Sequence, residues 1–119
     1  MSRFGRSIRP FIQSELDAAR RAMQAGDPPR EFARLERAHV LGQTDTWLHV
    51  RVHVCMLMWG LRQRSAREGA GQVIRILGAA TKTALGLVPQ GNSGGSRVSP
   101  WRRMPIAPEL QALITSAGG

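Results

Sequence analysis

All three histidines of the chain lie between residues 39 and 53, and a glutamate stands one helical turn before the first of them. Glu36 and His39 are spaced i, i+3, and His49 and His53 are spaced i, i+4, so each pair shares one face if its segment is helical. Imidazole and carboxylate groups are ligands that suit Zn(II), Cu(II), Ni(II) and Fe(II). The pattern predicts a transition-metal site formed by His39, His49 and His53. Glu36 is expected either as a further ligand or as a hydrogen-bond acceptor for one.

The four side chains flank a single short connection between two expected helices, over residues 28–41 and 46–64. A connection this short makes the two helices antiparallel neighbours, so side chains at matching distances from the turn can meet. Met56 shares the face of His49 and His53, and its thioether is a further candidate ligand for Cu(I). Cys55 points away from that face, which predicts a core thiol rather than a ligand.

Two other interpretations of the histidines remain open. Glu36 can accept a hydrogen bond from a histidine or an arginine, which would make the cluster a purely structural polar seam, and the side chains can also fail to converge. An enzyme that uses Glu36 as a base beside a bound metal is a weaker alternative, because no nucleophile or substrate pocket is recognisable in the sequence.

The elements that position these residues are all expected to be helical. Apolar residues recur at helical spacing over residues 10–25, 28–41, 46–64 and 67–85, and a short helix is expected over 109–116. Asp27 and either Thr44 or Asp45 suit helix N-caps, and Pro10 suits a first helical turn. Gly42 suits the left-handed position after a helix. The fold class predicted is a small all-α bundle of four main helices. The inner face of the fourth is expected to carry Val73, Ile74, Leu77, Ala80, Ala84 and Leu85.

Residues 1–119 are expected to form a single domain, with the bundle over 8–85 and a Pro/Gly-rich segment over 86–119. This segment holds enough apolar residues to pack back on the bundle: Val98, Trp101, Met104, Ile106, Leu110, Leu113 and Ile114. The glycine-rich stretch 91–95 is either an ordinary loop or a cradle of backbone N–H groups for an anion.

The alternative function is an interaction module. Residues 46–64 are apolar around most of the helical circumference, which predicts burial on several sides or pairing with a second copy or a partner protein. The hairpin 10–41 resembles a tetratricopeptide unit, with small residues where the helices touch and Gly26-Asp27 at the turn. In this interpretation the chain is a protein–protein interaction module or a homo-oligomer, and the histidine cluster is structural.

Composition narrows the partners further. The net charge is +9, and all but one of the 17 cationic residues are arginines. They are spread along the whole chain instead of forming one basic stripe, so nucleic acid is not favoured as a partner. No apolar run reaches the roughly 18–20 residues that a membrane helix needs. Residues 1–10 lack the apolar core of a secretory signal, and Cys55 has no second cysteine to pair with. We therefore expect a cytoplasmic location and no membrane insertion.

Four stretches together resemble a small uncharacterised bacterial family, a domain of unknown function whose members are associated with heavy-metal resistance gene neighbourhoods. They are residues 35–43, 49–53 with Met56-Leu57, 78–83, and 86–89 with Gly91-Asn92. The resemblance covers nearly the whole chain, and its motif segments include Glu36, His39, His49 and His53. Pro28-Pro29 and Trp101-Arg102-Arg103 depart from the family pattern. The resemblance implies a role in metal handling or resistance.

Overall fold

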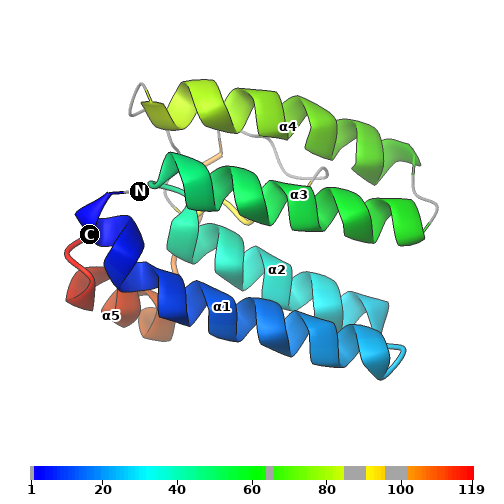
Figure 1. Cartoon of the computed structure of the whole chain (residues 1–119), viewed down its shortest axis with the longest axis horizontal. Coiled ribbons are helices and arrows are strands. Elements are labelled where there is room, and N and C mark those ends of the chain that lie inside the picture. The colour runs from blue at the N-terminus through cyan, green and yellow to red at the C-terminus, as the bar shows by residue number, and fades with distance from the viewer. Residues whose placement is uncertain (1, 64–65, 85–90, 96–101) are drawn as a thin grey trace.

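The computed structural model describes residues 2–63, 66–84, 91–95 and 102–119. Within these residues the chain forms helices and no strand, which confirms the predicted all-α class. The helices are α1 (Arg3–Gln24), α2 (Pro28–Gly42), α3 (Thr46–Arg62), α4 (Ala66–Ala84) and α5 (Pro108–Ser116) (Figure 1). The predicted helix ends at residues 64 and 85 lie outside the described residues. None of the described helices combines the length and the apolar character that a membrane crossing requires.

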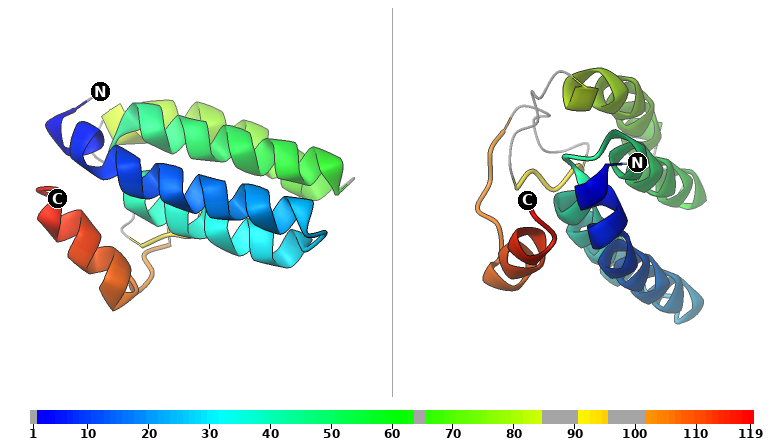
Figure 2. Two further views of the ribbon diagram at one scale, coloured as in Figure 1. Left: turned by 60° about the horizontal axis from the view of Figure 1, so that its bottom comes forward. Right: turned by 60° about the vertical axis from the view of Figure 1, so that its left-hand side comes forward.

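The first four helices form two antiparallel hairpins, α1 with α2 and α3 with α4, which meet where α2 packs against α3 (Figure 1). The last turns of α2 and α4 therefore lie at the same end of the molecule as the first turns of α1 and α3. Helix α5 lies against α1 and α2 at this end (Figure 2). The start of α1, the α2–α3 turn, the end of α4 and helix α5 therefore all lie at the end of the molecule that holds the histidines.

A compact apolar core joins α1, α2, α3 and α5. Leu110 of α5 is buried in it, and Ile106, Leu113 and Ile114 pack against it, so the C-terminal segment packs back as predicted. Val98 and Trp101 lie outside the described residues. The buried core residues are Ile8, Ile12, Ala19, Leu35, Ala38, Leu41, Leu48, Val52, Met56 and Leu110.

Helix α1 begins at Arg3, well before the predicted start at Pro10. Ser2 caps this helix, because its side chain accepts a hydrogen bond from the Gly5 N–H at 2.8 Å. Pro10 lies inside the helix, where it removes one backbone donor. The prediction was wrong because it treated Pro10 as a start signal, whereas the cap residue supplies that signal here.

Gly42 is the last residue of α2, and the left-handed position predicted for it is wrong. Its backbone is helical, and Gln43 follows it as a right-handed C-cap. A Cβ atom at Gly42 would lie 2.9 Å from the Cδ1 atom of Ile12 and 3.2 Å from the Cβ atom of Leu48. Glycine suits this position because Ile12 of α1 and Leu48 of α3 approach the end of α2 closely.

Helix α4 turns a different face to the protein than its apolar pattern predicts. Val73, Ile74 and Leu77 are 49%, 69% and 71% exposed, and Ala80 is also exposed, whereas Gln72 and Ala79 are fully buried. The predicted inner residue Leu85 and the side chain of Ala84 are outside what the structure describes. The inner face of α4 is set by polar contacts to α3 instead of by its apolar stripe.

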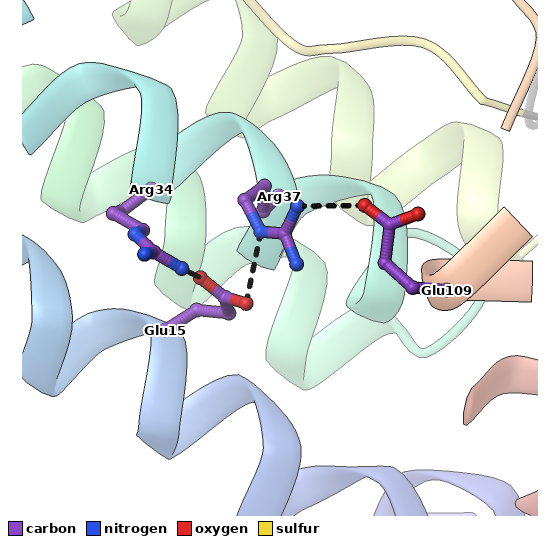
Figure 3. Close-up of polar contacts among 4 residues, drawn as sticks. All are labelled: Glu15, Arg34, Arg37 and Glu109. Carbon is purple, nitrogen blue, oxygen red and sulfur yellow. Dashed lines mark hydrogen bonds and ion pairs between the residues drawn. The ribbon is translucent and has the colours of Figure 1, made fainter. Parts of the chain in front are cut away.

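A seam of charged residues joins α1, α2 and α5 at the surface (Figure 3). The Glu15 carboxylate, 10% exposed, accepts hydrogen bonds from Arg34 Nη1 at 3.1 Å and Arg37 Nε at 3.0 Å. Arg37 also donates to Glu109 Oε1 of α5 at 3.1 Å. Its hydrogen bond to Glu15 raises the pKa of Arg37, and this outweighs the opposing effect of burial. The seam ties α5 to the hairpin that carries His39.

Asp45 links the start of α3 to the start of α1. Its carboxylate accepts hydrogen bonds from the Leu48 N–H at 3.1 Å, which caps α3, and from Ser2 Oγ at 2.6 Å and Ser2 N at 3.2 Å. Burial raises the pKa of Asp45, but the hydrogen bonds from Ser2 and Leu48 outweigh burial, so the pKa is lowered overall. This carboxylate therefore stabilises the folded chain when it is ionised.

We expect Asp45→Ala to lower the free energy of unfolding by about 1–3 kcal/mol at neutral pH, because a cap and a buried acceptor are lost together. Since the folded pKa is depressed, the stabilisation is complete above the ordinary value of about 3.9. It disappears as the pH falls through the folded pKa. Urea unfolding at pH 7 and at acid pH measures both effects. Asp27→Ala is the matched control, because Asp27 caps α2 through Arg30 N. Equal losses in the two variants would contradict a linking role for Asp45.

Candidate metal centre

The three histidines converge at the end of the molecule where α2 meets α3, as the sequence predicts. The three Nε2 atoms form a triangle with sides of 3.0 Å (His39–His49), 3.1 Å (His39–His53) and 3.2 Å (His49–His53). All three residues are 2–4% exposed. The His49 and His53 rings come from successive turns of α3, and the His39 ring reaches them from the last turns of α2. The cluster is a group of three buried nitrogens that could hold a metal ion.

Each imidazole also places its other nitrogen against an oxygen. His39 Nδ1 lies 2.6 Å from the carbonyl oxygen of Asn92, and His53 Nδ1 lies 2.6 Å from Gln72 Oε1. His49 Nδ1 lies 2.7 Å from Thr83 Oγ1. Two of these oxygens come from α4 and one from residues 91–95, so two separate parts of the chain orient the imidazoles.

The partners of these oxygens determine which nitrogen carries the hydrogen. The carbonyl oxygen of Asn92 can only accept. Gln72 donates from Nε2 to the Gly94 carbonyl at 2.9 Å, so its Oε1 faces His53 as an acceptor. Thr83 Oγ1 lies 3.4 Å from the Gln43 carbonyl, to which it can donate, and its oxygen can then accept from His49. All three imidazoles can therefore donate from Nδ1, and in that neutral form each presents an Nε2 lone pair to the other two.

Residues 91–95 cover the cluster. Gly94 has φ of +85°, and a Cβ atom there would lie 2.6 Å from Cδ2 and 2.7 Å from Cγ of His39. Only glycine allows the backbone to lie this close to the ring. The side chain of Asn92 holds the segment in shape, because Oδ1 accepts from the Gly94 N–H at 2.9 Å and Nδ2 donates to the Arg102 carbonyl at 2.8 Å.

The other residues predicted for the site lie around it in different ways. Glu36 is half-buried on α2, one turn before His39, and its carboxylate is not part of the group formed by the three histidines. Met56 is fully buried in the apolar core, one turn after His53 on α3. Cys55 lines a groove of about 260 Å³ together with residues of α1, in keeping with its predicted direction away from the histidines. Burial raises the pKa of its thiol.

Gln72, Thr83, Asn92 and Gly94 are site residues that sequence reasoning missed. Thr83 and Asn92 fall inside the stretches that carry the family resemblance, 78–83 and 91–92, but neither residue type is a typical metal ligand. The family motif therefore marked these two positions, but their residue types gave no chemical reason to place them at a metal site. Gln72 gave no signal, because a glutamine between apolar helical residues is usually read as a surface position.

Comparison with known proteins identifies a family. A family model with the description "Protein of unknown function (DUF3703)" matches residues 6–114. No curated protein matches the chain, and no solved structure matches it. The matched range contains all three histidines and each oxygen that contacts them. Since the model covers most of the sequence, the chain belongs to the DUF3703 family of proteins of unknown function.

Proposed function

We propose that this protein binds one divalent transition-metal ion through the Nε2 atoms of His39, His49 and His53. The observation that carries the proposal is the direction of the three lone pairs. With each Nδ1 donating to an oxygen, three Nε2 lone pairs face one another at 3.0–3.2 Å in a buried space. Three electron pairs at this separation repel one another, and a cation among them turns the repulsion into three bonds.

The dimensions of the triangle suit such an ion. An ion that lies about 1 Å outside the plane of the three nitrogens is about 2.0–2.1 Å from each of them, the usual Zn–N bond length. Histidine ligands in proteins almost always donate their second ring N–H to a carbonyl, a carboxylate or water, which fixes the tautomer and the ring. Asn92, Gln72 and Thr83 supply such acceptors here. The cluster thus resembles a three-histidine metal site in both its ligands and its supporting contacts.

The ligand chemistry narrows the choice of ion. Imidazole suits Zn, Cu, Ni and Fe, whereas carboxylate-poor sites do not suit Mg or Ca. Glu36 is proposed as an additional ligand or acceptor, and Met56 as a soft ligand for Cu(I). Because the three histidines are 2–4% exposed, the closed site favours metal handling, such as sensing, buffering or delivery in metal resistance, over catalysis.

Titration of the chelator-treated protein with Co(II) and Zn(II) tests the proposal. We expect one ion per chain, with visible absorption from the bound Co(II). If the protein takes up neither ion, the proposal fails and the histidine cluster is a structural polar seam.

A second candidate function is self-association through the outer faces of α3 and α4. Ile74 and Leu77 of α4 are 69% and 71% exposed, and α3 exposes Trp47, Met58 and Leu61. We propose that a second copy covers these side chains, in line with the interaction-module alternative and its tetratricopeptide-like hairpin. Exposed apolar side chains in such number are typical of an interface.

We expect light scattering to give a dimer mass for the wild type and a monomer mass for Leu77→Glu, because a buried charge without a partner opposes association. Gln24→Glu, at an exposed position at the end of α1, controls for the added charge. A wild-type monomer across the micromolar range, or a Leu77→Glu dimer, would contradict self-association through α4.

A further inference from the structure

We infer that residues 91–95 are a lid that controls how fast the metal ion enters and leaves, with the Asn92 side chain as its fastener. The inference rests on the proposed function. It adds regulation of exchange to the site, and its basis includes hydrogen bonds of the Asn92 side chain that involve no imidazole.

The first observation is that the cluster is closed. The three histidines are 2–4% exposed, and the main-chain atoms of residues 92–94 lie directly against the His39 ring. A hydrated ion must therefore displace part of the protein to reach the three Nε2 atoms, and residues 91–95 are a covering segment that belongs to no described helix.

The second observation is that the lid is fastened by contacts outside the ligand set. Asn92 Oδ1 accepts from the Gly94 N–H, and Asn92 Nδ2 donates to the Arg102 carbonyl, which ties the lid to the segment before α5. Neither bond involves an imidazole. The hydrogen bond from His39 is accepted by the backbone carbonyl of Asn92, which any residue at this position retains.

The third observation is that Gln72 connects the lid to a ligand. Its Oε1 accepts from His53 Nδ1, and its Nε2 donates to the Gly94 carbonyl at 2.9 Å. Gln72 is completely buried, so both bonds are protected from water. The same amide therefore orients His53 and holds the lid closed, and a change at Gln72 would mix the two effects. A substitution at Asn92 separates the two effects, because the side chain of Asn92 fastens the lid without orienting His53.

Variants at Asn92 test the lid by exchange kinetics. The apoprotein is loaded with Zn(II), and its release to an excess of a coloured chelator is followed by stopped flow, together with the rate of uptake. Asn92→Ala removes both fastening bonds, whereas Asn92→Asp keeps the acceptor for the Gly94 N–H and loses the donor to Arg102. Gln24→Ala, at an exposed site at the end of α1, is the control.

We expect uptake and release to accelerate together, by about tenfold in Asn92→Ala and by less in Asn92→Asp. The dissociation constant should change by less than about threefold, since the closed form is destabilised equally with and without the ion. Loss of a ligand would instead accelerate release alone. If circular dichroism shows that Asn92→Ala has lost helix, Asn92→Asp carries the test.

The outcomes separate this inference from the proposed function. If the wild type binds Zn(II) and both Asn92 variants exchange it at the wild-type rates, the lid is wrong and the metal site stands. If release accelerates without uptake, Asn92 acts on the ligands and the lid is again wrong. If the wild type takes up no ion, the metal site and the lid both fail.

Discussion

The double variant His49→Ala/His53→Ala is expected to lose metal binding, with the dissociation constant for Zn(II) raised by more than about a thousandfold. Two of the three Nε2 atoms disappear, and His39 alone cannot hold an ion against water. The wild type purified with Zn(II) in the medium should contain one ion per chain, and the double variant none. Elemental analysis of the two proteins measures the difference.

A matched control uses another pair of polar residues spaced i, i+4. Gln13 and Asp17 are hydrogen-bonded to each other at the surface of α1, away from the histidines. Gln13→Ala/Asp17→Ala should retain the wild-type metal content. Equal metal content in the wild type and the histidine variant would contradict the site. In that case, a large loss of stability in the histidine variant would identify the cluster as a structural element of the α2–α3 junction.

The histidine ligands could be predicted because their positions depend only on local rules. His49 and His53 are one turn apart on the same helix, and the short connection after α2 brings His39 to them. The oxygens that orient the rings could not be predicted in this way. Gln72, Thr83 and Asn92 reach the site because α4 and residues 91–95 fold back over α3, and this path depends on the whole tertiary structure.

The face of α4 illustrates the same limit in the fold. Its apolar stripe predicts that Val73, Ile74 and Leu77 point inward, but they are exposed, and Gln72 lies inside. Hydrogen bonds from Gln72 and Thr83 to the histidine cluster determine how the helix is rotated. A buried imidazole N–H without an acceptor costs about 1–3 kcal/mol, so these two contacts favour the face of α4 that carries Gln72 and Thr83. Sequence periodicity carries no information about such pairings between helices.

The substitution Gly94→Ala is expected to weaken metal binding although it replaces none of the three histidine ligands. The new Cβ atom would lie 2.6 Å from Cδ2 and 2.9 Å from Nε2 of His39, so either the ring or residues 91–95 must move. Displacement of the ring breaks the alignment of Nε2 with the other two imidazoles, and displacement of the segment breaks the Asn92–His39 bond. Changes to the groups that support a metal ligand typically cost 10–100-fold in affinity, so we expect a loss of about this size for Zn(II) by competition with a chelator.

Gly26→Ala separates the effect of the clash from that of the backbone. Gly26 has φ of +70°, close to the +85° of Gly94, but a Cβ atom there meets nothing within 4 Å. Both variants should lose about 1 kcal/mol of stability from the strained backbone, and Gly94→Ala should lose a further 1–3 kcal/mol or so from overpacking. Only Gly94→Ala should bind Zn(II) more weakly.

If both variants keep the wild-type affinity, residues 91–95 do not hold His39 in place. If both lose affinity equally, the cause is general destabilisation instead of contact with the ring. Because the two glycines share a backbone conformation and differ in their surroundings, the difference in affinity between the variants measures how far the cover over His39 shapes the metal centre.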